Sequence, residues 1–279
     1  LSISLLAAWS LIYFIIKSIF DTDIKETDEQ GKVKVPEKII FKKNTFQVII
    51  FAVYLIVLLI FQIFSSIYGF QSIAGNSNIS SKIPIIILYT IVPWFVMFGS
   101  LIFLLKMYPG WKIPFSNTFG YFIVKLLGIG KLMNKLLINF DEEGNSTEGN
   151  TNDENFNRAI RTVRPIVNDS SLIINEITSN NFNNFWFTME NGKLLKSEQL
   201  YFQEYNGETR EGAKENLERF INIKENIAEL FWYVLAGCYI ASYVQTLLNN
   251  IDVPVTQEEL NDTYNDNVEN SNNSDDNNK

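Results

Sequence analysis

The chain has 279 residues and a formal net charge of −8, with one cysteine and no histidine. A single cysteine excludes an intramolecular disulfide, and the lack of histidine excludes His-dependent triads and His-based metal sites within this chain. Hydrophobic residues make up 47% of the sequence and are gathered into runs of about 20 residues, the length that crosses a bilayer. We expect an all-α membrane protein with about four transmembrane helices, an interfacial amphipathic helix and a small soluble α or α+β region.

The first apolar run, residues 1–20, predicts a transmembrane helix. A signal peptide is the alternative, but the run has no basic start and no A-x-A cleavage site, and Lys17 lies near its end. Because the sequence does not begin with methionine, we expect a fragment or a gene model opened upstream of the true start. After a polar loop, residues 46–68 predict the second span, since only a helix satisfies its own backbone in lipid.

The third predicted span, 83–105, carries Pro93 in its middle. A proline inside a helix removes one backbone hydrogen bond, and its ring collides with the carbonyl four residues earlier. We therefore expect a kink that leaves the carbonyl near Tyr89 in need of another partner. A kink that serves packing and a hinge that serves gating both remain open.

An aromatic collar follows this span, and the start of the last span carries a further large aromatic. Such amphipathic rings are typical of headgroup depth. The predicted membrane-interface anchors are Tyr108, Trp111, Phe115, Phe119, Tyr121 and Trp232.

Residues 118–139 have apolar side chains at helical spacing with lysines opposite, which predicts an amphipathic helix lying along the membrane surface. A further span is the alternative. The lysines of this segment disfavour it, because each costs roughly 2.5–3.5 kcal/mol at the centre of a membrane helix.

Residues 140–157 form an acidic linker before the predicted soluble region, 158–226. Arg158, Arg161 and Arg164 recur at every third residue and are candidate contacts to anionic lipid, with nucleic acid a less favoured partner. A solvated helix face paired with linker acids is the competing interpretation. The Asn191-Gly192 pair favours a hairpin over 185–196, and 208–226 predicts a charged helix that continues into the last span.

The last span is predicted over 227–248, with Glu229 at its edge and a small-xxx-small pair, Gly237 and Ala241, that lets another helix approach closely. The tail, 249–279, is acidic and poor in hydrophobic residues, which predicts disorder. Loop 21–45 holds six lysines, and basic residues recur between 106 and 226. The positive-inside rule then puts both of these regions inside, with the N-terminus and the tail outside.

Two segments, YPGWKIPFSNTFGY at 108–121 and AELFWYVLAG at 228–237, resemble an uncharacterised family of multi-span membrane proteins of nucleocytoplasmic large DNA viruses. The resemblance implies a structural protein of the virion inner membrane or a host internal membrane, with the bilayer and the capsid or other membrane proteins as partners. It assigns no catalytic residue.

The predicted spans hold no paired carboxylates and the chain has no nucleotide motif, so we expect no enzyme activity, no cofactor and no metal. The alternative function is an oligomeric channel-like or host-membrane-remodelling protein that associates with further copies of itself through Gly237 and Ala241. A membrane lipid enzyme is a third, less favoured class.

Overall fold

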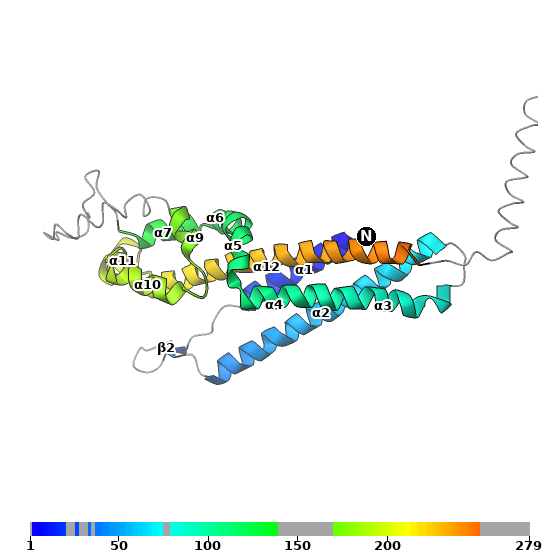
Figure 1. The fold of residues 1–279 in the computed structure, drawn as a ribbon. Helices are drawn as coiled ribbons and strands as arrows, with labels where there is room; N and C mark the ends of the chain where they lie inside the picture. The colour runs from blue at the N-terminus through cyan, green and yellow to red at the C-terminus, as the bar shows by residue number, and fades with distance from the viewer. Residues whose placement is uncertain are drawn as a thin grey trace, which may run out of the picture. The chain divides into compact units, whose positions relative to one another are not determined.

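The computed structural model describes residues 2–20, 26–27, 33–34, 37–74, 79–138 and 170–251 (Figure 1). The predicted acidic linker, the three arginines at 158, 161 and 164, and the tail from 252 onward lie outside these ranges, so those predictions stay untested. The chain divides into two compact units, which are described separately: the first comprises Leu1–Leu6, Leu55–Ser100 and Ala236–Lys279, and the second comprises Ala7–Tyr54 and Leu101–Leu235.

The described residues are almost entirely helical. The N-terminal half contains α1 (Ser2–Phe20), β1 (Glu26–Thr27), β2 (Val33–Lys34), α2 (Glu37–Ala74), η1 (Ile79–Ser81), α3 (Ile83–Pro93), η2 (Trp94–Phe98) and α4 (Gly99–Met107). The remainder contains η3 (Pro109–Lys112), α5 (Ile113–Phe115), η4 (Ser116–Gly120), α6 (Tyr121–Leu127), α7 (Ile129–Leu136), α9 (Ser170–Glu176), α10 (Phe182–Asn191), α11 (Glu198–Glu204) and α12 (Arg210–Asn249). Strands β1 and β2 pair antiparallel inside the predicted polar loop, and α2 begins within that loop.

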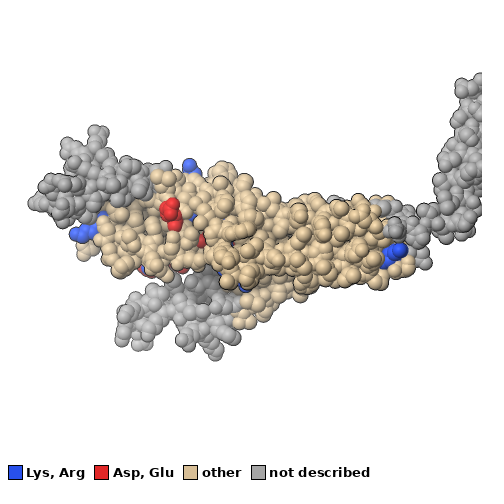
Figure 2. Space-filling model, viewed as in Figure 1, with Lys and Arg blue, Asp and Glu red and all other residues tan. Residues whose placement is uncertain are grey.

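Three of the described helical segments are long and apolar enough to cross a membrane: Thr45–Ser72 of α2, Ile83–Met107, and α12. They contain the second, third and last predicted spans. The predicted first span forms the shorter apolar helix α1, and its crossing of the membrane stays a prediction. Outward-facing side chains on the first two of these segments are large and apolar, for example Phe64 and Val96, which indicates a lipid-facing surface. Figure 2 shows an uncharged surface over α3.

Pro93 ends α3, and the chain continues as the wide π-helical turn η2 before regular helix resumes at Gly99. The amide of Trp94 donates to the carbonyls of Thr90 and Ile91 at this point. A π turn is one of the local adjustments that accommodate a proline within a membrane helix. The helix is therefore locally irregular after Pro93, and the predicted kink itself stays a prediction.

The second unit contains a small helical domain, built by α7, α9, α10, α11 and the first half of α12. Its core includes Ile174, Trp186, Tyr201 and Leu217, all buried. The predicted hairpin over 185–196 is wrong, because these residues largely belong to α10 and its C-terminal turn. Phe182, Trp186 and Met189 follow the helical period and all face this core. Gly192 has a φ of −71°, whereas a type I′ turn needs positive φ.

The prediction of one continuous helix over 118–139 is also wrong, because the structure divides this segment into two helices. Gly128 has a φ of 103°, and this left-handed residue ends α6 before α7 begins. Ile129, Met133 and Leu136 of α7 are buried in the domain core, whereas Phe122 and Leu126 of α6 are exposed. Residues 129–138 therefore belong with the helical domain, in which the only described β-type pairing is the isolated bridge between Leu137 and Leu195.

The prediction of a charged helix that continues into the last span is confirmed, because α12 runs unbroken for 40 residues. At 1.5 Å per residue this is about 60 Å, roughly twice the hydrocarbon thickness of a bilayer. Only the apolar half, 227–248, has the composition and length of a membrane span, and residues 210–226 precede it within the helical domain.

Candidate functional site

Three charged side chains from distant parts of the chain meet at the edge of the last predicted span. Lys17 Nζ of α1 lies 2.6 Å from Glu229 Oε2 of α12, and Lys112 Nζ of η3 lies 2.7 Å from Glu229 Oε1. Each side chain is about one-fifth exposed or less. These three residues, called the junction triad below, connect the first helix, the aromatic collar and the last helix.

The turn that breaks the chain after α4 places Lys112 in this triad. Tyr108 leaves the helical conformation, Pro109 starts the short 3₁₀ turn η3, and Lys112 is the last residue of that turn. Glu225 lies one helical turn before Glu229 on α12, and its carboxylate is 3.8 Å from Lys112 Nζ. The backbone amide of Ser179 donates to Glu225 Oε1 at 2.8 Å, which links the triad to the helical domain.

The carboxylates around Lys112 favour its charged form. Burial lowers the pKa of Lys112, but the carboxylates of Glu229 and Glu225 outweigh burial, so the pKa is raised from its ordinary value. Lys17 and Lys112 balance the charge of Glu229 and Glu225. A buried ion pair of this kind adds little net stability, yet removing one partner is costly because the other charge is left buried and unpaired. The triad is therefore suited to specifying which helices pack together.

Next to the triad, aromatic rings of the collar stack against the start of the last span. The indole Nε1 of Trp232 donates to the Trp111 carbonyl at 2.8 Å, and the two rings lie 5.8 Å apart. Phe115 meets the edge of Trp232 at 5.1 Å, and Phe119 stacks on Phe231 at 4.1 Å. We call these five residues the aromatic cluster.

The aromatic cluster contains four of the six predicted interface anchors. Of the other two, Tyr108 is exposed and has no ring contact with another described residue. Tyr121 packs against the core of the helical domain, and Lys125 Nζ lies 5.7 Å from its ring. The headgroup depth of all six remains a prediction.

A second buried cation ties the collar to the helical domain. Lys224 is fully buried, and its Nζ donates to the carbonyls of Ile174 at 2.7 Å and Ile177 at 2.9 Å. These carbonyls lie at the C-terminal end of α9, where helical carbonyls lack partners within the helix. A longer contact of 3.4 Å reaches Asn117 Oδ1 in η4. Burial lowers the Lys224 pKa to about 8, against the opposing effect of nearby carboxylates.

Gly120 allows the collar to approach α12 closely. A Cβ atom at this position would lie 2.4 Å from the Lys224 carbonyl oxygen, a distance that no real side chain tolerates without movement of the backbone. The glycine is therefore required by contact with a neighbouring helix, because its own conformation is ordinary helix, with a φ of −60°.

The predicted helix-packing residue Gly237 already has a neighbour within the chain. A Cβ atom there would lie 2.3 Å from Leu6 Cδ1 of α1, so the glycine permits close approach of these two helices in the first unit. Ala241 is half-buried. Whether either residue also contacts a second copy is untested.

Sequence reasoning missed the junction triad and the Lys224 contacts. The signal for the triad was present, because Lys17 and Glu229 are the charges at the edges of two otherwise uncharged runs and Lys112 lies just beyond a third. Lys224 gave no such signal, since a lysine in a charged helix looks solvated. In the sequence it is one of the basic residues between 106 and 226 that set the predicted topology.

The charged groups described here pair with one another, and within the described ranges no cluster of three or more His, Cys, Asp or Glu residues is placed to hold a metal ion. The arrangement is suited to holding helices in fixed positions. No protein-family model, curated protein or solved structure matches this chain.

Proposed function

We propose that this chain is a structural integral membrane protein that holds a small helical domain at one face of a bilayer. The observation that carries the proposal is the junction triad. It joins α1, the collar and α12 at the point where the apolar half of α12 begins. Because one carboxylate is shared by two lysines, the positions of α1, η3 and α12 at this point are set by the same residue.

In this proposal α1 is a fourth span, and the N-terminus and the acidic tail lie on the side opposite the helical domain. The pairing of Lys17 with Glu229 supports this topology, because it places the C-terminal end of α1 beside the start of the apolar half of α12. The exposed apolar side chains of α6, including Phe122 and Leu126, support its position in the interface beside the collar.

We further propose that the membrane is the inner membrane of a large DNA virus, where the helical domain contacts the capsid or a neighbouring membrane protein. Support comes from the resemblance of 108–121 and 228–237 to a viral family. These two segments, over 100 residues apart in sequence, pack on each other through Trp111, Phe115 and Phe119 against Phe231 and Trp232. The two segments that carry the resemblance are therefore in contact in the folded chain.

Topology is tested by introducing glycosylation sites or single cysteines at positions 78, 150 and 265 in the full chain. We expect position 150 on one side of the membrane and positions 78 and 265 on the other. Finding 150 and 265 on the same side would overturn the four-span arrangement. The viral role is tested separately by mass spectrometry of washed virions, and absence of the chain from the particles would refute it.

The alternative, an oligomeric channel-like or membrane-remodelling protein, needs an interface between copies. Gly237→Leu does not test it cleanly, because the new side chain would collide with Leu6 of the same chain. Ala241→Leu is the better variant. Ion flux in reconstituted liposomes that is lost in this variant, with helix content unchanged, would favour the alternative.

A further inference from the structure

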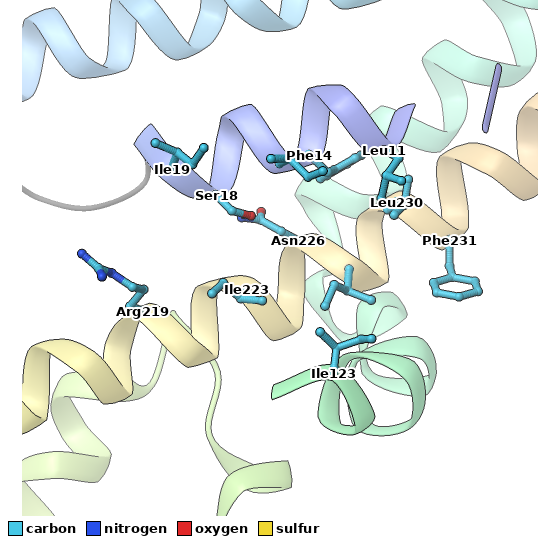
Figure 3. Close-up of a pocket in the computed structure, with 12 residues that line it drawn as sticks. Leu11, Phe14, Ser18, Ile19, Ile123, Arg219, Ile223, Asn226, Leu230 and Phe231 are labelled. Carbon is cyan, nitrogen blue, oxygen red and sulfur yellow. The ribbon is translucent and has the colours of Figure 1, made fainter. Parts of the chain in front are cut away.

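A groove runs along one side of the second unit between α1 and α12, with α6 at its edge (Figure 3). Its volume is about 680 Å³, within the usual range of small-molecule sites. One wall is formed by Leu11, Ile15 and Ile19 of α1, and the other by Ile223, Ile227 and Leu230 of α12. Each set recurs at helical spacing, so each helix turns one apolar stripe toward the groove.

The groove differs at its two ends. Figure 3 shows Phe231 and Leu11 near one end, and Arg219 near the other. Arg219 is exposed and makes no ion pair with another residue among those described. Between the ends, Asn226 Nδ2 donates to Ser18 Oγ at 3.2 Å, so these polar groups bond to each other. An apolar groove with a cation at one end suits a ligand that has an apolar chain and an anionic head.

The length of the groove also matches such a ligand. Arg219 and Phe231 are twelve residues apart on α12, which corresponds to about 18 Å. One leaflet of the hydrocarbon core is about 15 Å thick, so a lipid acyl chain has a comparable length. Phe231 lies in the apolar half of α12, and Arg219 and Ile223 precede that half within the helical domain, so the tail of a bound lipid would point toward the membrane and its head toward the domain.

We propose that this groove binds one phospholipid with an anionic headgroup, with an acyl chain between α1 and α12 and the phosphate at Arg219. A guanidinium presents several donors in a planar fork that suits phosphate oxygens. The inference rests on the membrane position of the proposed function and is independent of the viral role. The bound lipid would fill the space between the first helix and the last.

Native mass spectrometry of the full chain, released from nanodiscs of phosphatidylcholine with a minor fraction of phosphatidylglycerol, tests the proposal. We expect one retained phospholipid, enriched in phosphatidylglycerol. Arg219→Gln should reduce this enrichment roughly five-fold, since one arginine near a membrane surface contributes about 1 kcal/mol toward anionic lipid. Ile223→Trp should fill the groove and remove the retained lipid of either kind.

Two matched variants control for general effects. Lys131→Gln removes one exposed positive charge on α7, and Leu126→Trp adds the same ring at an exposed position on α6 outside the groove. Both should retain lipid as the wild type does. If Ile223→Trp fails to fold, judged by its circular dichroism, Ile123→Trp fills the groove from α6 instead.

Three outcomes would overturn the proposal: no lipid retained by the wild type, equal retention by the groove-filling variant, or no headgroup preference. A segment of this chain is the competing occupant. A photoreactive residue at position 227 distinguishes the two, because crosslinking to lipid supports the proposal and crosslinking to a peptide of the same chain refutes it. Failure here would leave the topology of the proposed function unaffected, since the topology is tested by accessibility.

Discussion

The two halves of α12 show how one continuous helix suits two different surroundings. In residues 210–226 the side chains turned inward include Ala213, Leu217 and Ile221 together with the buried Lys224, and the outward face carries charged residues such as Glu215. In the apolar half, Tyr233, Ile240 and Val244 are buried, but the outward residues include Leu235 and Tyr239. Apart from Lys224, the buried faces of the two halves are both apolar, whereas the outward faces are charged in the first half and apolar in the second. The outward side chains therefore show which environment surrounds the helix, because the inward side chains pack against protein in both halves.

The largest effect is expected from a pair of matched truncations on the two halves. Leu217→Ala removes a fully buried side chain from the helical domain and should lower its free energy of unfolding by about 2–5 kcal/mol. Leu235→Ala removes the same atoms from an outward, half-exposed position in the apolar half and should change it by less than about 0.5 kcal/mol. Denaturant unfolding of the full chain in detergent, followed by tryptophan fluorescence, measures both. Equal losses would contradict the division of α12 into two environments.

Breaking the junction triad tests the point where the two halves meet. Glu229→Gln leaves Lys17 and Lys112 partly buried without their shared carboxylate, and we expect a loss of about 3 kcal/mol. Glu211→Gln breaks a more exposed pair with Lys214 in the first turn of the same helix and should cost less than about 1 kcal/mol. The same unfolding measurement applies. A Glu229→Gln variant as stable as Glu211→Gln would show that the triad does not hold the helices.

The buried Lys224 makes the stability of the helical domain depend on pH. Burial lowers its pKa in the folded chain to about 8 from an ordinary value of 10.5, which the unfolded chain retains. Between these values the unfolded state binds a proton that the folded state does not, so stability should rise with pH above about 8. We expect a gain of about 2 kcal/mol by pH 9.5, at about 1.4 kcal/mol for each pKa unit.

Unfolding curves at about pH 7.5, 8.5 and 9.5 measure how steeply the free energy of unfolding rises with pH. Lys224→Met should remove the rise, and Lys131→Met, which removes an exposed lysine, should keep it. A rise of the same size in Lys224→Met would assign the titration to another group.

Gly120 tests the close approach of the collar to the first half of α12. A Cβ atom here meets the backbone of Lys224, so Gly120→Ala should cost about 1–3 kcal/mol by forcing the collar away from α12. Gly99→Ala places its Cβ in open space and should leave stability within about 0.5 kcal/mol or raise it slightly, since alanine favours helix. Thermal unfolding in detergent compares the two. Equal melting temperatures would show that the close approach at Gly120 is not needed.

Local pattern in the sequence was sufficient for the apolar helices. The runs at 46–68, 83–105 and 227–248 are long and apolar enough to cross a membrane, and helix is the conformation that such runs adopt in lipid. The charged helix before the last span and the irregularity at Pro93 were also predictable, because each follows from residues adjacent in the chain.

Only the tertiary structure decided which charges and rings meet. Glu229 pairs with Lys17 from 212 residues earlier and with Lys112 from more than 100 residues earlier, and nothing local to any of the three specifies the other two. The break at Gly128 also depends on packing, because Ile129 and Met133 after it are buried in the core of the helical domain. The helix in place of the predicted hairpin has the same cause: burial of Trp186 in that core outweighed the local turn signal at Asn191-Gly192. Spans follow from composition over about 20 residues, whereas the junction follows from packing between distant helices.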